Sequence, residues 1–194
     1  NEDILAAFLQ YIDRLPQFSE LFYCADDTGA REAARLIFSS RPDLILTPYG
    51  TSAHGDFGIK MLGIQNGQSV FSLRGFAGEF RIGIPGEHSV LNATAAIALV
   101  IGLIKQERKE ITVADLTVIR NSLASFKGAK RRSEILGEAN GILFMDDYGH
   151  HPTAIHKTLK GIHEFYPNRR IIADFMSHTY SRTAALLTEF ADAF

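Results

Sequence analysis

Cysteine is almost absent from this sequence, since Cys24 is the single one in 194 residues and no internal disulfide can form. One thiol fits a reducing compartment such as the cytoplasm. A charge excess is absent too, because 20 Lys and Arg stand against 22 Asp and Glu, for a net charge of −2. Such a balance offers no electrostatic case for nucleic acid or an anionic membrane as partner. The longest apolar stretch, 93–104, is too short to span a bilayer, so no membrane insertion is expected.

Two catalytic signatures are also missing from the 194 residues. No phosphate-binding loop of the form G-x-x-x-x-G-K-[ST] occurs, so a nucleoside triphosphate site must draw its main phosphate cradle from elsewhere. No Ser-His-Asp or Cys-His arrangement is evident, and Cys24 is expected in a buried strand rather than as a nucleophile. Because the chain starts without methionine and both ends fall within apparent helices, we expect it to be part of a longer protein.

The pattern of the first half predicts an α/β unit followed by a meander. Hydrophobic residues make up 46% of the chain, enough for one large domain or two smaller ones. Apolar residues at helical spacing predict a helix over 4–15, and strand, helix and strand are expected over 20–27, 28–40 and 43–50. Short, partly alternating segments then predict antiparallel strands over 55–62, 68–75 and 78–86.

The second half predicts helices first and a return to α/β texture afterwards. An alanine-rich helix is expected to start near His88 or Ser89, and a second one over 112–126 with Thr112 as N-cap. An Asn140-Gly141 turn is expected to join two strands. A helix over 151–167, a buried strand over 169–176 and a helix over 181–194 complete the series, with a domain boundary near 126–130.

The stretch DDYGHHP, residues 146–152, gathers titratable groups at the end of an apolar strand. In open parallel sheets ligands collect at the carboxyl ends of strands, and the N-terminus of a following helix favours anions. Asp147, Tyr148, His150 and His151 are therefore candidates for a binding crevice. Helix capping and solvated histidines explain the same residues about equally well. A metal site ranks lower, because adjacent histidines rarely face one ion.

Three further clusters carry candidate binding groups. SHTYSRT, 177–183, also follows an expected strand, and its His178 and Arg182 would project from the same rim, although simple capping is the alternative. In KGAKRR, 127–132, Arg132 is placed to reach a phosphate between domains, while most dibasic pairs are only solvated. His88 and Asn92 lie one helical turn apart, where the amide suits a purine edge or a core hydrogen bond.

Taken in this order, the four clusters resemble those of the Mur ligases of peptidoglycan synthesis. DDYGHHPTAI, HTYSRT, GEHSVLNATAA and FKGAKRRSEILGE carry the resemblance, which extends over nearly the whole chain. It implies that 1–126 is the rear part of a P-loop-type ATPase domain with an antiparallel meander. Residues 127–194 would be a truncated Rossmann-like C-terminal domain that brings the amino acid.

The resemblance also implies a reaction and a set of roles. It implies ATP and Mg²⁺ as cofactors, with the principal metal ligands outside this chain, and UDP-N-acetylmuramic acid and L-alanine as substrates of a cytoplasmic ligase. His88, Asn92, Arg132 and Asp147 would bind the nucleotide. A second set would line the amino-acid and reaction-centre side: Tyr148, His150, His151, His178 and Arg182. The residues counted as catalytic would be Arg132, Asp147, His151, His178 and Arg182.

Two departures and two alternatives accompany this interpretation. Ser89 stands where the family has Asn, and Met176-Ser177 where it has Gln-Pro, so adenine recognition and one loop path are expected to differ.

A ligase that recycles muropeptides onto the same sugar nucleotide fits DDYGHHPTAI in part, whereas HTYSRT favours alanine addition. A non-catalytic relative that binds without turnover draws its support from the two departures.

Overall fold

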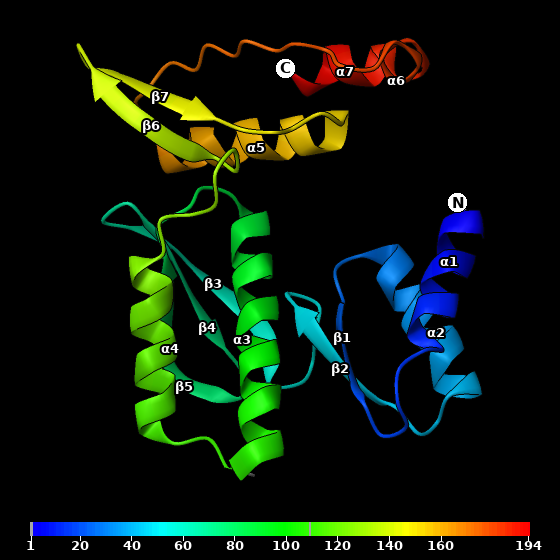
Figure 1. The fold of residues 1–194 in the computed structure, drawn as a ribbon. Coiled ribbons are helices and arrows are strands. Elements are labelled where there is room, and N and C mark those ends of the chain that lie inside the picture. The colour runs from blue at the N-terminus through cyan, green and yellow to red at the C-terminus, as the bar shows by residue number, and fades with distance from the viewer. Residues whose placement is uncertain (1, 109) are drawn as a thin grey trace.

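The computed structural model describes residues 2–108 and 110–194. A five-stranded sheet with helices forms one part of the chain, and a two-stranded sheet with three helices forms the other, above α3 and α4 in Figure 1. The strand order β1-β2-β3-β4-β5 of the larger sheet follows the chain. The α/β class expected from the sequence is therefore confirmed, with a mixed rather than purely parallel sheet.

The expected parallel unit is present near the N-terminus. Strand β1 (Glu20–Cys24) pairs in parallel with β2 (Ile45–Gly50), and α2 (Thr28–Ser40) connects them. Asp27 caps α2 because its side chain accepts a hydrogen bond from the backbone N–H of Ala30 at 2.7 Å. Helix α1 (Glu2–Ile12) packs on α2 and ends three residues before the expected Leu15. Cys24 is half-buried within β1 rather than fully buried.

The three segments after residue 55 form the predicted antiparallel meander. Strand β3 (Phe57–Gln65) pairs in parallel with β2, then in the antiparallel sense with β4 (Gln68–Leu73), which pairs with β5 (Phe76–Ile82). Phe71 and Phe80 on β4 and β5 are fully buried and stack with their ring centroids 5.7 Å apart. These aromatic rings anchor the largest hydrophobic core, which α3 covers.

Helices α3 (Glu87–Arg108) and α4 (Val113–Ser125) lie side by side over this sheet (Figure 1). Thr112 and Asp115 form a reciprocal capping box at the start of α4, as the N-cap prediction required. By length and composition alone, α3 is long and apolar enough to cross a membrane. The helix extends beyond the apolar stretch 93–104 that was judged too short from the sequence. Its residues Ile97, Ala98 and Ile101 are buried in the core of the sheet, whereas Leu99 and Leu103 are exposed.

The last part of the chain begins with the predicted hairpin. Strands β6 (Glu134–Ala139) and β7 (Ile142–Asp146) are antiparallel, and Asn140 and Gly141 both have positive φ, at 52° and 77°, as a tight hairpin turn requires. Helix α5 (Pro152–Phe165) follows, with His151 as N-cap and Pro152 in its first turn.

The prediction of a buried strand over 169–176 was wrong. Residues 170–179 have no regular secondary structure, and Ile172 is 80% exposed. A strand exists only through ladder hydrogen bonds to a neighbour, and this segment is instead held by Phe175, whose ring stacks on Phe190 at 5.4 Å. The single helix expected over 181–194 was also wrong, since α6 (Tyr180–Ala185) and α7 (Leu187–Ala193) are separated at Leu186.

Candidate functional site

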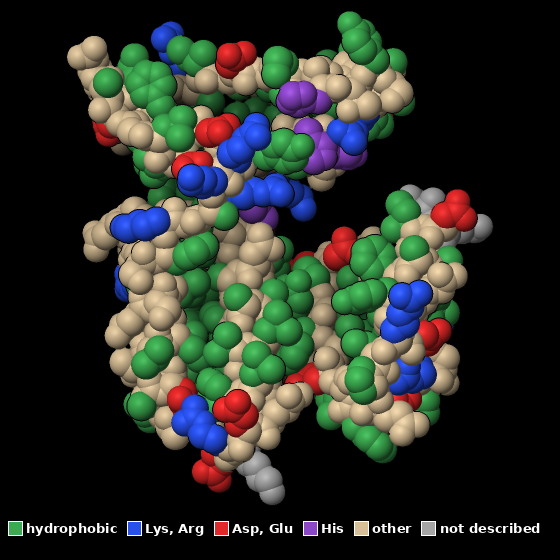
Figure 2. All heavy atoms as spheres, viewed as in Figure 1, with side chains coloured by type: hydrophobic (Ala, Val, Ile, Leu, Met, Phe, Trp, Pro, Cys, Tyr) green, Lys and Arg blue, Asp and Glu red, His purple; other side chains and the backbone are tan. Residues whose placement is uncertain are grey.

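The principal cavity lies where the C-terminal part meets the ends of α3 and α4, and its volume is about 1010 Å³. Figure 2 shows basic side chains gathered at this junction, above the apolar surface of the two helices. One end of the cavity is polar and formed by three chain segments. The polar side chains at that end come from the start of α3, from the loop before β6, and from the segment that runs from the residue after β7 into α5: His88, Asn92, Arg132, Ser133, Asp147, Lys157 and Thr158.

Four residues named by three separate motifs therefore line one cavity. His88 and Asn92 come from α3, Arg132 from the loop that precedes β6, and Asp147 from the residue after β7. Asn92 is exposed and His88 is half-buried. The other end of the cavity is apolar, lined on α3 and α4 by aliphatic side chains such as Ala96. A polar end with a few convergent groups and an apolar remainder is the usual make-up of a small-molecule site.

The surroundings of His88 lower the pKa of its imidazole below its ordinary value, which favours the neutral ring. Burial lowers the pKa of its imidazole, the negative charge of Asp147 raises it, and the positive charge of Lys157 lowers it further. The ring lies over Gly86, because a Cβ at that glycine would come within 2.5 Å of the imidazole Cε1. Gly86 also has φ of +93°, so both the backbone and the ring require glycine there. A neutral imidazole can donate through one nitrogen and accept through the other.

Asp147 holds the two loops at the polar end together. One carboxylate oxygen accepts a hydrogen bond from the backbone N–H of Ser133 at 2.8 Å and lies 3.3 Å from its hydroxyl. The other oxygen accepts from the backbone N–H of Gly149 at 2.7 Å. Ser133 is only 7% exposed, so its N–H has little access to water. Asp147 thus ties Ser133, the residue after Arg132, to the turn that follows β7, and it has limited acceptor capacity left for a ligand.

Tyr148 packs against the dibasic pair that precedes β6. The guanidinium carbon of Arg131 lies 5.0 Å from the centre of the Tyr148 ring and that of Arg132 lies 6.0 Å from it. The backbone N–H of Tyr148 donates to the carbonyl of Arg131 at 2.8 Å. Asp146 lies 3.6 Å from Arg131, which gives Arg131 a carboxylate neighbour. Arg132 has no ion-pair partner within 2–108 and 110–194 and faces the cavity.

The two histidines of the first motif lie outside the cavity and are exposed. His151 caps α5, since its Nδ1 accepts from the backbone N–H of Thr153 at 3.3 Å. Nδ1 of His150 lies 3.0 Å from the carbonyl oxygen of Tyr148, and its ring meets that of Tyr148 edge-on at 5.2 Å. The capping alternative therefore describes His151, although the cap is the histidine rather than an aspartate.

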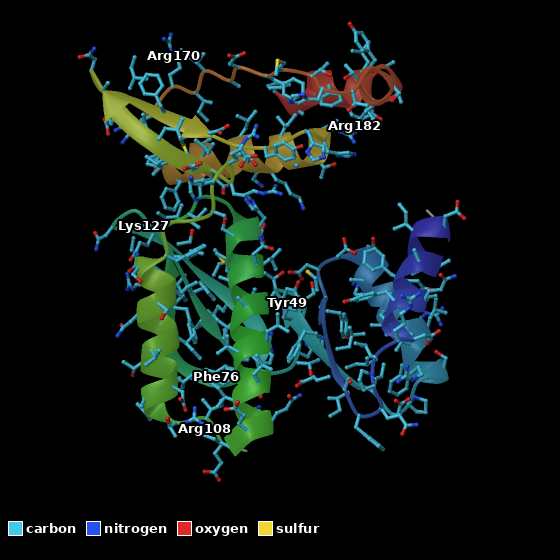
Figure 3. All side chains as sticks on the ribbon, viewed as in Figure 1. Tyr49, Phe76, Arg108, Lys127, Arg170 and Arg182 are labelled. Atoms are coloured by element: carbon cyan, nitrogen blue, oxygen red, sulfur yellow. The ribbon has the colours of Figure 1, made fainter. Side chains whose placement is uncertain are left out.

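The second rim motif also lies outside the cavity. His178 is exposed within the irregular segment, and Arg182 is half-buried in the short helix α6. Figure 3 shows Arg182 at the end of the C-terminal part where α5 begins, the end at which the loop after β7 also lies. Arg182 thus lies at the same end as the first motif, while the cavity gathers only four of the predicted side chains.

Sequence reasoning missed Lys157, Thr158 and Ser133 at this site. The signal for the first two was available, because Ala154, Lys157, Thr158 and Gly161 recur at helical spacing and lie on one face of α5. Ser133 gave no signal, since its contact with Asp147 spans 14 residues. Ser89, where Asn was expected, is buried and donates its hydroxyl proton to the carbonyl of Pro85 at 2.8 Å. No group of three or more potential metal ligands occurs in the described residues.

Comparison with known proteins relates the chain to one family. Residues 131–194 match the family described as Mur ligase, glutamate ligase domain. The whole chain is 65% identical over 193 residues to the UDP-N-acetylmuramate–L-alanine ligase of Treponema pallidum strain Nichols, and it spans 40% of the length of that relative. The resemblance to the Mur ligases is therefore confirmed.

Two solved structures share the fold. The folylpolyglutamate synthetase of Lactobacillus casei superposes with a TM-score of 0.69 at 16% identity, over 100% of this chain and 46% of the other. The UDP-N-acetylmuramate–alanine ligase of Thermotoga maritima superposes with a TM-score of 0.58 at 23% identity, over 86% of this chain and 38% of the other. The fold class predicted from the sequence is confirmed by these similarities.

Proposed function

We propose that this Mur ligase chain is part of an ATP-dependent ligase that joins L-alanine to UDP-N-acetylmuramic acid in cytoplasmic peptidoglycan synthesis. The chain covers 40% of the length of its relatives, so this activity is proposed for the longer protein to which it corresponds. The observation that carries the proposal is the convergence of His88, Asn92, Arg132 and Asp147 on one cavity. We further propose that 1–126 and 127–194 are parts of two domains, with the cavity between them.

The residues at the polar end fit an adenine nucleotide. A neutral His88 and the exposed amide of Asn92 can each donate and accept, which suits the edge of a purine. Arg132 offers a planar guanidinium for phosphate oxygens and has no competing carboxylate within the described residues. When bound, ATP with Mg²⁺ supplies the phosphoryl group that activates the muramic acid carboxylate as an acyl phosphate, which the amine of L-alanine then attacks.

The chain's own residues act mainly by positioning and charge neutralisation. In phosphoryl transfer these effects supply most of the rate enhancement. Asp147 orients Arg132 through its hydrogen bonds to Ser133, and Tyr148 supports the same arginine through its ring face. We propose that the residues of the two loop motifs outside the cavity line the region that the amino acid reaches: His150, His151, His178 and Arg182.

A test of this proposal uses the full-length protein with ATP, Mg²⁺ and UDP-N-acetylmuramic acid. Phosphate release that depends on L-alanine is expected. The Arg132→Ala variant should lower kcat/KM for ATP by about 10²-fold or more, because a phosphate-binding guanidinium is lost. Arg170→Ala is the matched control, since Arg170 is exposed and lies at the far end of the C-terminal part (Figure 3). An unchanged kcat/KM in Arg132→Ala would contradict the assignment.

The same assay separates the two alternatives. A ligase that recycles muropeptides would release phosphate with a tripeptide and not with L-alanine. A non-catalytic relative would bind ATP without turnover of either acceptor.

A further inference from the structure

Lys157 is held over the polar end of the cavity by a close contact between two helices. Gly161 on α5 approaches Gly86 just before α3 so closely that a Cβ on Gly161 would come within 2.5 Å of the Gly86 Cα. Lys157 lies one helical turn before Gly161, and His88 lies two residues after Gly86. The glycine contact therefore sets Lys157 beside His88, and both side chains line the cavity.

The ammonium group of Lys157 has no acidic partner in the part of the chain that the structure describes. Lys160, one turn further along α5, instead lies 3.9 Å from Glu164 at the surface. The one acid among the residues that line the cavity is Asp147, whose two oxygens accept hydrogen bonds from Ser133 and Gly149. Lys157 is thus a cation that points into a cavity without being neutralised by the protein.

The cavity carries a surplus of positive charge although the chain as a whole is acidic. The ionised side chains that line it are Arg132, Lys157 and Asp147, two cations and one anion, whereas the chain has a net charge of −2. A concave site with an excess of one charge attracts ligands of the opposite charge. The ligand that fits the polar end is therefore an anion that can contact Arg132 and Lys157 together.

We propose that Lys157 is a further nucleotide-binding residue, which donates hydrogen bonds to the phosphate chain of the adenine nucleotide alongside Arg132. An ammonium group has three donors and no acceptor, so it is poorly suited to the mixed donor and acceptor edge of a purine. Its long stem lets the charge follow phosphate oxygens that the helix itself cannot reach. This inference rests on the proposed function, because it takes the ligand of the cavity to be a nucleotide.

Direct binding measurements on the full-length protein test the inference separately from catalysis. The affinities of adenosine, AMP, ADP and ATP are measured by titration calorimetry for the wild type, Lys157→Gln, Lys157→Arg and Lys160→Gln. Lys157→Gln should weaken ATP binding by about tenfold, which corresponds to one charge-assisted hydrogen bond, and should change adenosine binding by less than about twofold. Lys157→Arg should bind ATP within about twofold of the wild type, and Lys160→Gln should match the wild type.

The loss in Lys157→Gln should also shrink as salt is raised, since an exposed cation and a phosphate are screened. Equal losses for adenosine and ATP would overturn the inference, because the contact would then be to the base or ribose. An ATP affinity unchanged in Lys157→Gln, or lowered as much in Lys160→Gln, would overturn it as well. A protein that binds ATP through Lys157 but does not ligate L-alanine would contradict the proposed reaction while supporting this residue's role.

Discussion

Asp147 is predicted to stabilise the folded chain even when no ligand is bound. The Asp147→Ala substitution removes the acceptor of two short hydrogen bonds, from the backbone N–H groups of Ser133 and Gly149, and one longer contact to the Ser133 hydroxyl. Ser133 is 7% exposed, so its N–H is left without a partner and with little access to water. A buried donor without an acceptor carries its full desolvation cost.

The size of the effect follows from the type and burial of these bonds. Hydrogen bonds to a charged group contribute about 1.5–3 kcal/mol each, and the half-buried Gly149 end can recover part of its loss from water. We therefore expect Asp147→Ala to lower the free energy of unfolding by about 2–4 kcal/mol. For a chain of this size each kcal/mol lowers Tm by about 2–4 °C, which gives a decrease of roughly 4–16 °C.

A graded series of variants checks this estimate. Asp147→Asn keeps one acceptor oxygen and should lose about half as much as Asp147→Ala. Ser133→Ala removes only the 3.3 Å hydroxyl contact and should cost less than about 1 kcal/mol. Urea unfolding followed by circular dichroism, without nucleotide, measures all three. If Asp147→Ala were no less stable than Ser133→Ala, the carboxylate would not hold the two loops together, and its role would lie with a ligand alone.

Three further predictions address the core, acid stability and the helix contact. Phe71→Ala should lower the free energy of unfolding by about 3–5 kcal/mol in urea unfolding, because the ring is fully buried, while Phe38→Ala, 71% exposed, should cost less than about 1 kcal/mol. Hydrogen bonds from the N-cap threonine of α4 lower the pKa of Asp115 to about 2. Its contribution to stability should thus be present above about pH 4, be lost as pH falls toward 2, and be missing from the pH profile of Asp115→Asn. Gly161→Ala should weaken ATP binding in calorimetry while the circular dichroism spectrum stays unchanged, because its Cβ would displace α5 from Gly86; an unaltered affinity would show that this contact does not shape the cavity.

Elements with complete local signals were predicted well from the sequence. The N-cap at Thr112, the Asn140-Gly141 turn and Pro152 at the start of α5 each act through neighbours within a few residues, and each was found in place. The segment over 169–176 failed because its apolar pattern fits a strand, whereas strand formation needs a paired neighbour that no local pattern reveals. The helix break at Leu186 was missed for the lack of a glycine or proline to mark it.

The candidate site was predicted unevenly for a related reason. Motifs named the candidate side chains, and four of these candidates share the cavity: His88, Asn92, Arg132 and Asp147. Sequence alone did not separate these four from the exposed histidines of the same turn, because adjacent residues in a loop point in different directions. His150 and His151 make their hydrogen bonds to the loop itself and to the start of α5.

The position of the cavity depends on a contact that no motif contains. Gly86 and Gly161 lie far apart in the sequence, and neither carries a functional group, yet their close approach brings α5 over the start of α3. That approach places Lys157 near His88 and encloses the polar end between groups from three chain segments. Any side chain at Gly161 would separate these groups while leaving each motif intact. The candidate side chains of the site thus come from the motifs, whereas their arrangement depends on the contact between Gly86 and Gly161, neither of which was a candidate binding residue.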